Sequence, residues 1–279
     1  MKRDALIALL LALTAIGWLL QRADDVDHSE AEARPLSSTT LLNNAPEDFL
    51  RVTGPAPLAF PADHGSHAGY RNEWWYFTGN LADEAGRRYG FQYTLFRFAL
   101  PQFETRDSDF ETAALWMGHL AVSDFDRQRF FKVERFGRDA LGLAGADQDL
   151  WWLRDWEVRR TGDSWRLQAG FEGVDLDLEL EPLRPIVLQG NAGYSRKGPE
   201  PGNASRYYSI TRIGVSGALA LDGEPRRVSG LAWLDREWGS SQLGEGIAGW
   251  DWFALQLDDG RDLMLYRLRT EDGQAAPFS

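Results

Sequence analysis

Apolar and polar residues alternate along most of this chain after about residue 74, and this period of two constrains the fold more than any other feature. In the segment VDLDLELE at 174–181, four aliphatic side chains fall on one face and four acidic side chains on the other. Successive side chains of a β-strand point to opposite sides, so the pattern predicts a strand with one buried face. We therefore expect an all-β fold.

Turn-forming runs separate the alternating segments. ADEAG, RTGDS and LDGEP are rich in Gly, Asp or Pro, which favour tight turns. We expect about a dozen strands and few helices, with one helical turn near residues 140–144. Many strands with short connections indicate an antiparallel barrel or sandwich. The clearest further strands are residues 89–95, 115–121 and 165–171.

Two aromatic segments resemble each other and indicate a duplicated element. GYRNEWWYFTGNL at 69–81 aligns without a gap with GWDWFALQL at 249–257, which pairs Trp74 with Trp250. A small closed barrel needs about eight strands, and residues 69–194 supply them. Since the chain after residue 206 supplies only about five or six, we expect two consecutive antiparallel barrels, the second incomplete.

Both faces of the first aromatic strand are apolar. Alternation places Trp75 and Phe77 on one face and Trp74 and Tyr76 on the other. Such a strand is covered on both sides. One face can fill or line a barrel, and the other can meet the neighbouring barrel.

The composition excludes several classes of partner and fold. A formal net charge of −12 argues against a nucleic-acid partner, because counterion release requires clustered Lys and Arg. The chain has no cysteine, so packing rather than disulfides must hold the fold. Its 12 tryptophans call for large apolar or ring-stacking surfaces.

The first residues predict export. Lys2 and Arg3 precede an apolar run from Ala5 to Leu20, as in a signal peptide. The run is long for a signal peptide and short of the roughly 20 residues of a comfortable span, so residues 1–22 are either a cleaved signal or a retained membrane anchor. Both alternatives place the body in the periplasm or outside the cell. Residues 23–56 form a polar linker.

Longer motifs carry a family resemblance. HGSHAGYRNEWWYFTGNL, GLAWLDREWGS and GWDWFALQLDDGRDLMLYRLR resemble the AttH-like, carotenoid 1,2-hydratase-related family over residues 57–270. The resemblance implies two lipocalin-like, or calycin, barrels, which we place at 57–202 and 203–279. It also implies lipid or isoprenoid chemistry, and members often carry the label of predicted secreted hydrolase.

Two departures separate the chain from the carotenoid hydratases of that family. Where those enzymes have Asp-His-Asn-Trp-Gly, residues 235–239 read DREWG, so Arg236 replaces a histidine. Where they have Tyr-x-Asp, Leu268 follows Tyr266 and Arg267, so the acid is missing.

If the chain is an enzyme, which the sequence leaves open, the resemblance implies a cofactor-free hydratase acting on an isoprenoid alkene. Such a reaction needs a carboxylic acid that is protonated near neutral pH, and an apolar pocket raises a carboxyl pKa by desolvation. Asp251, between two tryptophans, fits best, and Asp235 and Glu237 are second choices. Trp238, Trp250 and Tyr266 would surround the cation. The predicted catalytic residues are Asp251, Asp235, Glu237 and Tyr266.

The candidate acids also have purely structural interpretations. Asp235, Arg236 and Glu237 can form a structural ion-pair network, and Asp251 can face solvent because alternation sets it opposite its flanking rings. Glu73 is expected to pair with Arg71 or another arginine at the barrel rim.

Ligand-binding side chains are expected among the rings and one histidine. His119 shares a strand face with apolar neighbours, so we expect it inside the first barrel, either as a buried neutral residue or in proton transfer. The candidates are Trp75, Phe77, His119, Trp238, Trp250 and Trp252.

The sequence lacks the residues that a serine or cysteine hydrolase or a zinc site would need. There is no cysteine and no G-x-S-x-G elbow, which leaves a serine or cysteine hydrolase unsupported. His64 and His67 lie close together, but zinc would need a third ligand, so we expect no metal and no cofactor.

The sequence thus predicts an exported, lipocalin-like protein that binds or modifies an apolar lipid or isoprenoid. A cofactor-free hydratase is one alternative. A non-catalytic carrier, or a structural partner of an envelope ABC-type lipid-export system, is another.

Overall fold

The computed structural model describes residues 49–101, 108–240 and 246–277. All of them belong to one compact unit, residues 38–279. The predicted export segment and the first part of the linker are therefore not described. No helix within the described ranges is both long and apolar enough to cross a membrane.

The described chain is all-β, as predicted. It contains 15 strands and two short 3-10 turns, Ala62–His64 and Ala140–Gly142, the second where a helical turn was expected. The strands are β1 (Asn72–Asp83), β2 (Arg88–Ala99), β3 (Ala114–Asp124), β4 (Arg129–Arg138), β5 (Ala144–Ala146), β6 (Leu150–Leu153), β7 (Trp156–Thr161), β8 (Ser164–Phe171), β9 (Val174–Pro182), β10 (Val187–Leu188), β11 (Tyr194–Arg196), β12 (Ala204–Leu221), β13 (Glu224–Gly239), β14 (Ile247–Gln256) and β15 (Asp262–Thr270).

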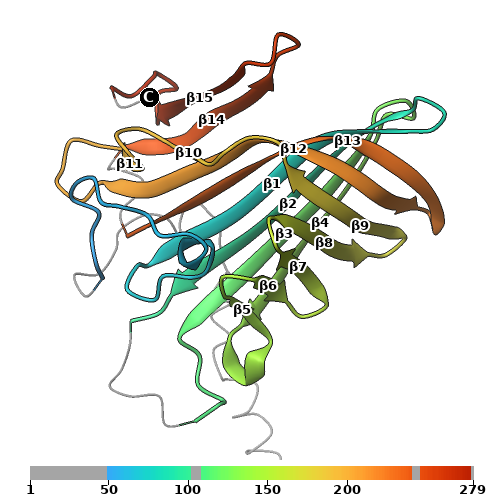
Figure 1. Ribbon diagram of the computed structural model, residues 1–279. Coiled ribbons are helices and arrows are strands. Elements are labelled where there is room, and N and C mark those ends of the chain that lie inside the picture. The colour runs from blue at the N-terminus through green and yellow to red at the C-terminus, as the bar shows by residue number, and fades with distance from the viewer. Residues whose placement is uncertain (1–48, 102–107, 241–245, 278–279) are drawn as a thin grey trace, which may run out of the picture. The chain divides into compact units, whose positions relative to one another are not determined.

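Thirteen of these strands form one antiparallel sheet that curves into a nearly closed barrel (Figure 1). Its order is β4-β3-β2-β1-β13-β12-β9-β8-β7-β6-β5, and β10 and β11 also pair with β12. A small second sheet, the hairpin β14–β15, stands where the sequence predicted a second, incomplete barrel. The large sheet runs across the predicted domain boundary at residue 203, and that division stays a prediction.

Glycines let the two ends of the large sheet approach each other. A Cβ atom at Gly118 of β3 would lie 2.8 Å from side-chain atoms of Leu153 in β6 and of Trp156 in β7. Gly137 of β4 would likewise meet Leu153, at 2.5 Å. Side chains of β6 and β7 therefore fill the space where β3 and β4 have none, and this packing closes the barrel.

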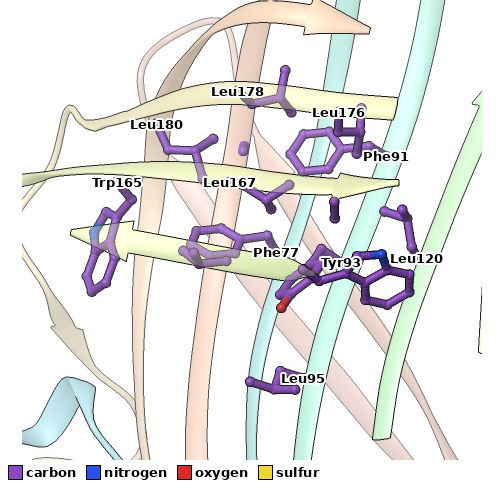
Figure 2. Packing of buried hydrophobic residues seen from close by; sticks show 14 of the residues in the cluster. Phe77, Phe91, Tyr93, Leu95, Leu120, Trp165, Leu167, Leu176, Leu178 and Leu180 are labelled. Carbon is purple, nitrogen blue, oxygen red and sulfur yellow. The ribbon is translucent and has the colours of Figure 1, made fainter. Parts of the chain in front are cut away.

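The barrel interior holds the main hydrophobic core. The aliphatic face of VDLDLELE is buried there as predicted, and Figure 2 shows its Leu176, Leu178 and Leu180 among the core side chains. Trp75 and Phe77 of β1 belong to the same core and are fully buried. The predicted inward face of β1 is thus confirmed.

The hairpin β14–β15 covers the outer face of β1, β2 and β3. A second, smaller core joins Phe98 of β2 and Met117 of β3 to Leu268 of β15, and Trp74 packs against it. The other predicted face of β1 therefore meets the second sheet, also as predicted.

Candidate functional site

Two rows of side chains cross the outer face of the barrel. We call polar row the residues His119, Thr94, Tyr76, Asp235 and Ser209, which are direct register partners on β3, β2, β1, β13 and β12. The adjacent aromatic row is Met117, Phe96, Trp74, Glu237 and Tyr207. Residues paired across a sheet point to the same side, so both rows face the hairpin.

A cavity of about 380 Å³ lies between these rows and the hairpin. Its volume is in the range of pockets that hold small organic ligands. Most residues of the two rows, with some neighbours, form one wall, and the hairpin forms the other with Trp250, Trp252, Tyr266 and Leu268. The lining from the large sheet and its loops comprises Trp74, Tyr76, Gln92, Thr94, Phe96, His119, Lys197, Tyr207, Asp235 and Glu237.

Ring contacts hold the hairpin over the sheet. Trp252 meets Tyr76 edge to face, with ring centroids 5.3 Å apart, and meets Trp233 in the same way at 6.1 Å. Its indole Nε1 also donates a 3.4 Å hydrogen bond to the hydroxyl of Tyr207. Trp252 is thus both a wall of the cavity and a link between the two sheets.

Asp235 is a buried carboxyl group on the cavity wall. Oδ1 accepts hydrogen bonds from Ser209 Oγ at 2.5 Å and Trp233 Nε1 at 2.7 Å, and Oδ2 accepts one from the Tyr207 hydroxyl at 2.8 Å. Burial raises the pKa of Asp235 to about 6, although the three hydrogen bonds act in the opposite direction. No cation pairs with Asp235 within the part of the chain that the structure describes. Asp235 can therefore be a proton donor near neutral pH.

Glu237, two residues further along β13, has a different environment. Its Oε1 lies 3.0 Å from the ammonium of Lys197 and accepts a hydrogen bond from Ser205 Oγ. The Lys197 ammonium also lies over two rings of the wall, at 4.6 Å from Tyr266 and 5.1 Å from Tyr207. The cavity thus contains one carboxyl group in an ion pair and one held only by neutral donors.

His119 lies at the far end of the polar row. Its Nε2 is 2.8 Å from Glu134 Oε2 of β4, and its ring meets Phe96 edge to face at 5.3 Å. The expectation that His119 lies inside the barrel was wrong. Both faces of β3 are apolar, and the inward face carries Trp116 and Leu120 instead.

The structure brings together six of the ten predicted site residues in this cavity. Asp235, Glu237 and Tyr266 come from the predicted catalytic set. From the predicted ligand-binding set, the cavity wall contains His119, Trp250 and Trp252.

The other four lie elsewhere, which corrects the prediction of where they act. Asp251 is on the opposite face of the hairpin, paired with Arg267 at 2.8 Å and Arg269 at 3.4 Å, because alternation turns it away from its flanking tryptophans. Trp75 and Phe77 are buried in the barrel core. Trp238 is also buried and stacks on His67 with ring centroids 4.0 Å apart.

An ion-pair cluster fills one end of the barrel. Fully buried Glu73 accepts hydrogen bonds from Arg236 Nη2 at 2.5 Å and Arg97 Nη1 at 2.9 Å, and His67 Nδ1 lies 3.1 Å from it. Burial by itself raises the pKa of Glu73, but Arg236, His67 and Arg97 outweigh it and lower the pKa to about 2. The predicted Glu73–arginine pairing is thus present, with Arg97 and Arg236 as partners. Arg236 belongs to this structural cluster and not to the cavity.

The two neighbouring histidines have separate partners. His64 Nδ1 lies 2.6 Å from the Tyr208 hydroxyl, and burial lowers the pKa of His64 to about 4. His67 lies between Asp63 and Glu73. Among the described residues, no group of three or more His, Cys, Asp or Glu side chains could hold a metal ion.

The sequence-based prediction missed Tyr207, Ser209 and Lys197. Tyr207 and Ser209 alternate in the string RYYSITR, and this spacing puts both hydroxyls on one strand face. That signal was present, but only the register of β12 against β13 shows that both hydroxyls reach Asp235. Lys197 precedes β12 in an irregular loop and gave no signal.

Two of the comparisons with known proteins identify the same family. The family model described as AttH-like matches residues 51–279. The crystal structure of an AttH candidate from Nitrosomonas europaea is 37% identical in sequence, with a TM-score of 0.75 over 81% of this chain and 69% of that chain. The crystal structure of kievitone hydratase from Nectria haematococca covers 83% of this chain and 72% of that chain, with a TM-score of 0.52. At 12% identity this second likeness is one of fold alone. No match was found among curated proteins.

Proposed function

We propose, from the premise that this chain belongs to the AttH-like family, that it binds an apolar unsaturated molecule between its two sheets and adds water to a carbon–carbon double bond. Asp235 carries this proposal, because it is a buried carboxyl group with a pKa near 6 in an aromatic cavity. Enzymes use such raised carboxyl pKa values for general acids.

The first step is proton transfer from Asp235 to the double bond. A C–H bond forms, the π bond breaks, and the adjacent carbon becomes a tertiary carbocation. Tyr76, Trp74 and Trp252 lie around the cavity beside Asp235, and their electron-rich faces stabilise a cation.

Water then captures the carbocation. The new C–O bond leaves a proton on the water oxygen, and this proton returns to the carboxylate of Asp235, so alkene and water give an alcohol with no external reagent. Glu237 is less suited to be the acid because Lys197 already pairs with it. The Tyr207 hydroxyl and Ser209 fix the orientation of the Asp235 carboxyl group through their hydrogen bonds.

The proposed ligand is an isoprenoid or similar lipid. The walls are largely aromatic, and the ionisable side chains that line the cavity are the paired Lys197 and Glu237 together with Asp235 and His119. Export, a membrane tether and an envelope partner stay predictions.

A deuterium-incorporation experiment tests the hydration. The protein is incubated in D₂O with farnesol or with 2,6,10-trimethyldodeca-2,6,10-triene, its analogue without the hydroxyl, and products are analysed by mass spectrometry. We expect one carbon-bound deuterium for each oxygen added, and a loss of rate of about 100- to 10,000-fold in Asp235→Asn. The matched control is Asp251→Asn, which alters a carboxylate on the other face of the hairpin. Equal rates in the two variants would remove Asp235 from the mechanism.

A carrier function is the second candidate. The observation that favours it is the Lys197–Glu237 pair, since a paired carboxylate in an apolar cavity needs no catalytic role. Stoichiometric binding of either probe without any product would support the carrier.

A further inference from the structure

The polar row continues from Asp235 across the barrel to a second hydrogen-bonding group. His119, Thr94, Tyr76 and Asp235 are successive register partners on β3, β2, β1 and β13. Neighbouring strands are about 4.8 Å apart, so three such steps separate the backbones of His119 and Asp235 by about 14 Å. Both side chains line the same cavity, which is therefore an elongated groove across the strands.

The His119 end can accept a hydrogen bond. Its Nε2 is 2.8 Å from Glu134 Oε2, and a ring nitrogen that faces a carboxylate carries the proton and donates it. In that neutral tautomer Nδ1 keeps a lone pair, which accepts a hydrogen bond from a hydroxyl group. The His119 side chain is 28% exposed, so the group it binds lies near the rim of the groove.

The middle of the groove suits the uncharged hydrocarbon part of a ligand. The Thr94 hydroxyl already accepts a hydrogen bond from Gln92 Nε2 at 3.0 Å, and the Tyr76 ring lies edge to face against Trp252. The aromatic row and the hairpin supply apolar surface along the same length. Lys197 lies at the Asp235 end of the groove and is paired with Glu237. Its charge therefore does not require an anionic group on the ligand.

We propose, building on the hydratase function above, that the substrate is a linear unsaturated alcohol: its terminal trisubstituted double bond lies at Asp235, and its hydroxyl donates a hydrogen bond to His119. The two ends of the groove set the length of this alkenol. His119 is then a specificity residue of the same site.

Farnesol has a suitable length. About ten bonds separate its terminal double bond from its oxygen, which spans about 12 Å at the advance of an extended chain, about 1.2 Å per bond. Geraniol has about six such bonds and spans about 7 Å, half of the groove. The backbone separation of about 14 Å exceeds the span of farnesol by about 2 Å and that of geraniol by about 7 Å, so farnesol leaves less distance for the Asp235 and His119 side chains to cover.

Binding to the full chain tests the inference. Quenching of tryptophan fluorescence gives dissociation constants for farnesol, for geraniol and for the hydroxyl-free trimethyldodecatriene. The variants are His119→Phe, which keeps a ring without nitrogens, and Lys132→Met as a matched control. Lys132 lies on the exposed face of β4 beside Glu134, but it pairs with Ala121 and does not line the groove.

We expect wild-type protein to bind farnesol at least tenfold more tightly than either comparison ligand. His119→Phe should bind farnesol and the hydroxyl-free analogue equally, while Lys132→Met should keep the wild-type preference. Equal binding of the two ligands by wild type, or a preference that survives in His119→Phe, would overturn the proposal.

The same probes separate this inference from the proposed function. A preference for farnesol that disappears in His119→Phe, without incorporation of deuterium from D₂O, would support the alkenol groove and contradict hydration. Hydration of both farnesol and the hydroxyl-free analogue at equal affinity would contradict the alkenol groove alone.

Discussion

Replacing Glu73 with glutamine should destabilise the barrel by about 3–5 kcal/mol, the usual cost of breaking a buried ion pair from one side. The glutamine keeps the size of the side chain but removes its charge. Arg236, which is fully buried, and Arg97, which is 5% exposed, would then have lost their carboxylate partner. The two guanidinium groups would then be buried with no negatively charged partner at this position of β1.

The pKa of Glu73 gives an independent magnitude. Burial acts to raise it, yet Arg236, His67 and Arg97 lower it from 4.5 to about 2. At about 1.4 kcal/mol for each tenfold change in proton affinity, the ionised form is stabilised by about 3 kcal/mol in the folded state. Because the folded pKa is depressed, this stability is present above pH 4.5 and is lost as the pH falls towards 2.

Urea unfolding at pH 7 measures the effect, with Asp251→Asn as the control. Asp251 sits in an ion pair whose carboxylate is 31% exposed, so its loss should cost at most about 1 kcal/mol. In a thermal scan, Glu73→Gln should melt roughly 6 to 20 °C below wild type. A Glu73→Gln protein within about 1 kcal/mol of Asp251→Asn would refute the argument that this cluster holds the barrel end.

Three further changes test the cavity and the barrel. The folded pKa of Asp235, about 6, exceeds its ordinary value of 3.8. The free energy of unfolding of the wild type should therefore fall by about 3 kcal/mol as the pH rises from about 4 to 6. Urea unfolding of Asp235→Asn should not show this fall. Ser209→Ala removes a hydrogen bond that lowers the pKa of Asp235, so the alkaline limb of the pH–rate profile should move to higher pH. Gly118→Val should cost about 1–3 kcal/mol in urea unfolding by forcing Trp156 away, and an unchanged midpoint would contradict the closure of the barrel through this contact.

The alternating pattern predicted which side chains share a face. Trp75 and Phe77 turned out to face the barrel core, and Trp74 and Tyr76 the second sheet, because the period of two depends only on local backbone geometry. The same rule placed Asp251 opposite its tryptophans, and the structure has it there.

What alternation could not supply was the register between distant strands. Asp235 meets Ser209 and Tyr207 because β13 pairs with β12 in one register, and a slip of one residue would turn these groups to the other face. His119 was placed on the wrong side since β3 is apolar on both faces, and only the packing of the hairpin distinguishes them. The resemblance identified the family but not the partners of Arg236.

The pH dependence of water addition to farnesol tests the central claim most directly. If Asp235 is the proton donor, kcat/KM should be constant at low pH and fall tenfold for each unit above about pH 6, and Asp235→Asn should lack this limb along with most of the rate. A rate that is independent of pH between 5 and 8, or that rises over this range, would contradict a protonated Asp235 as the acid.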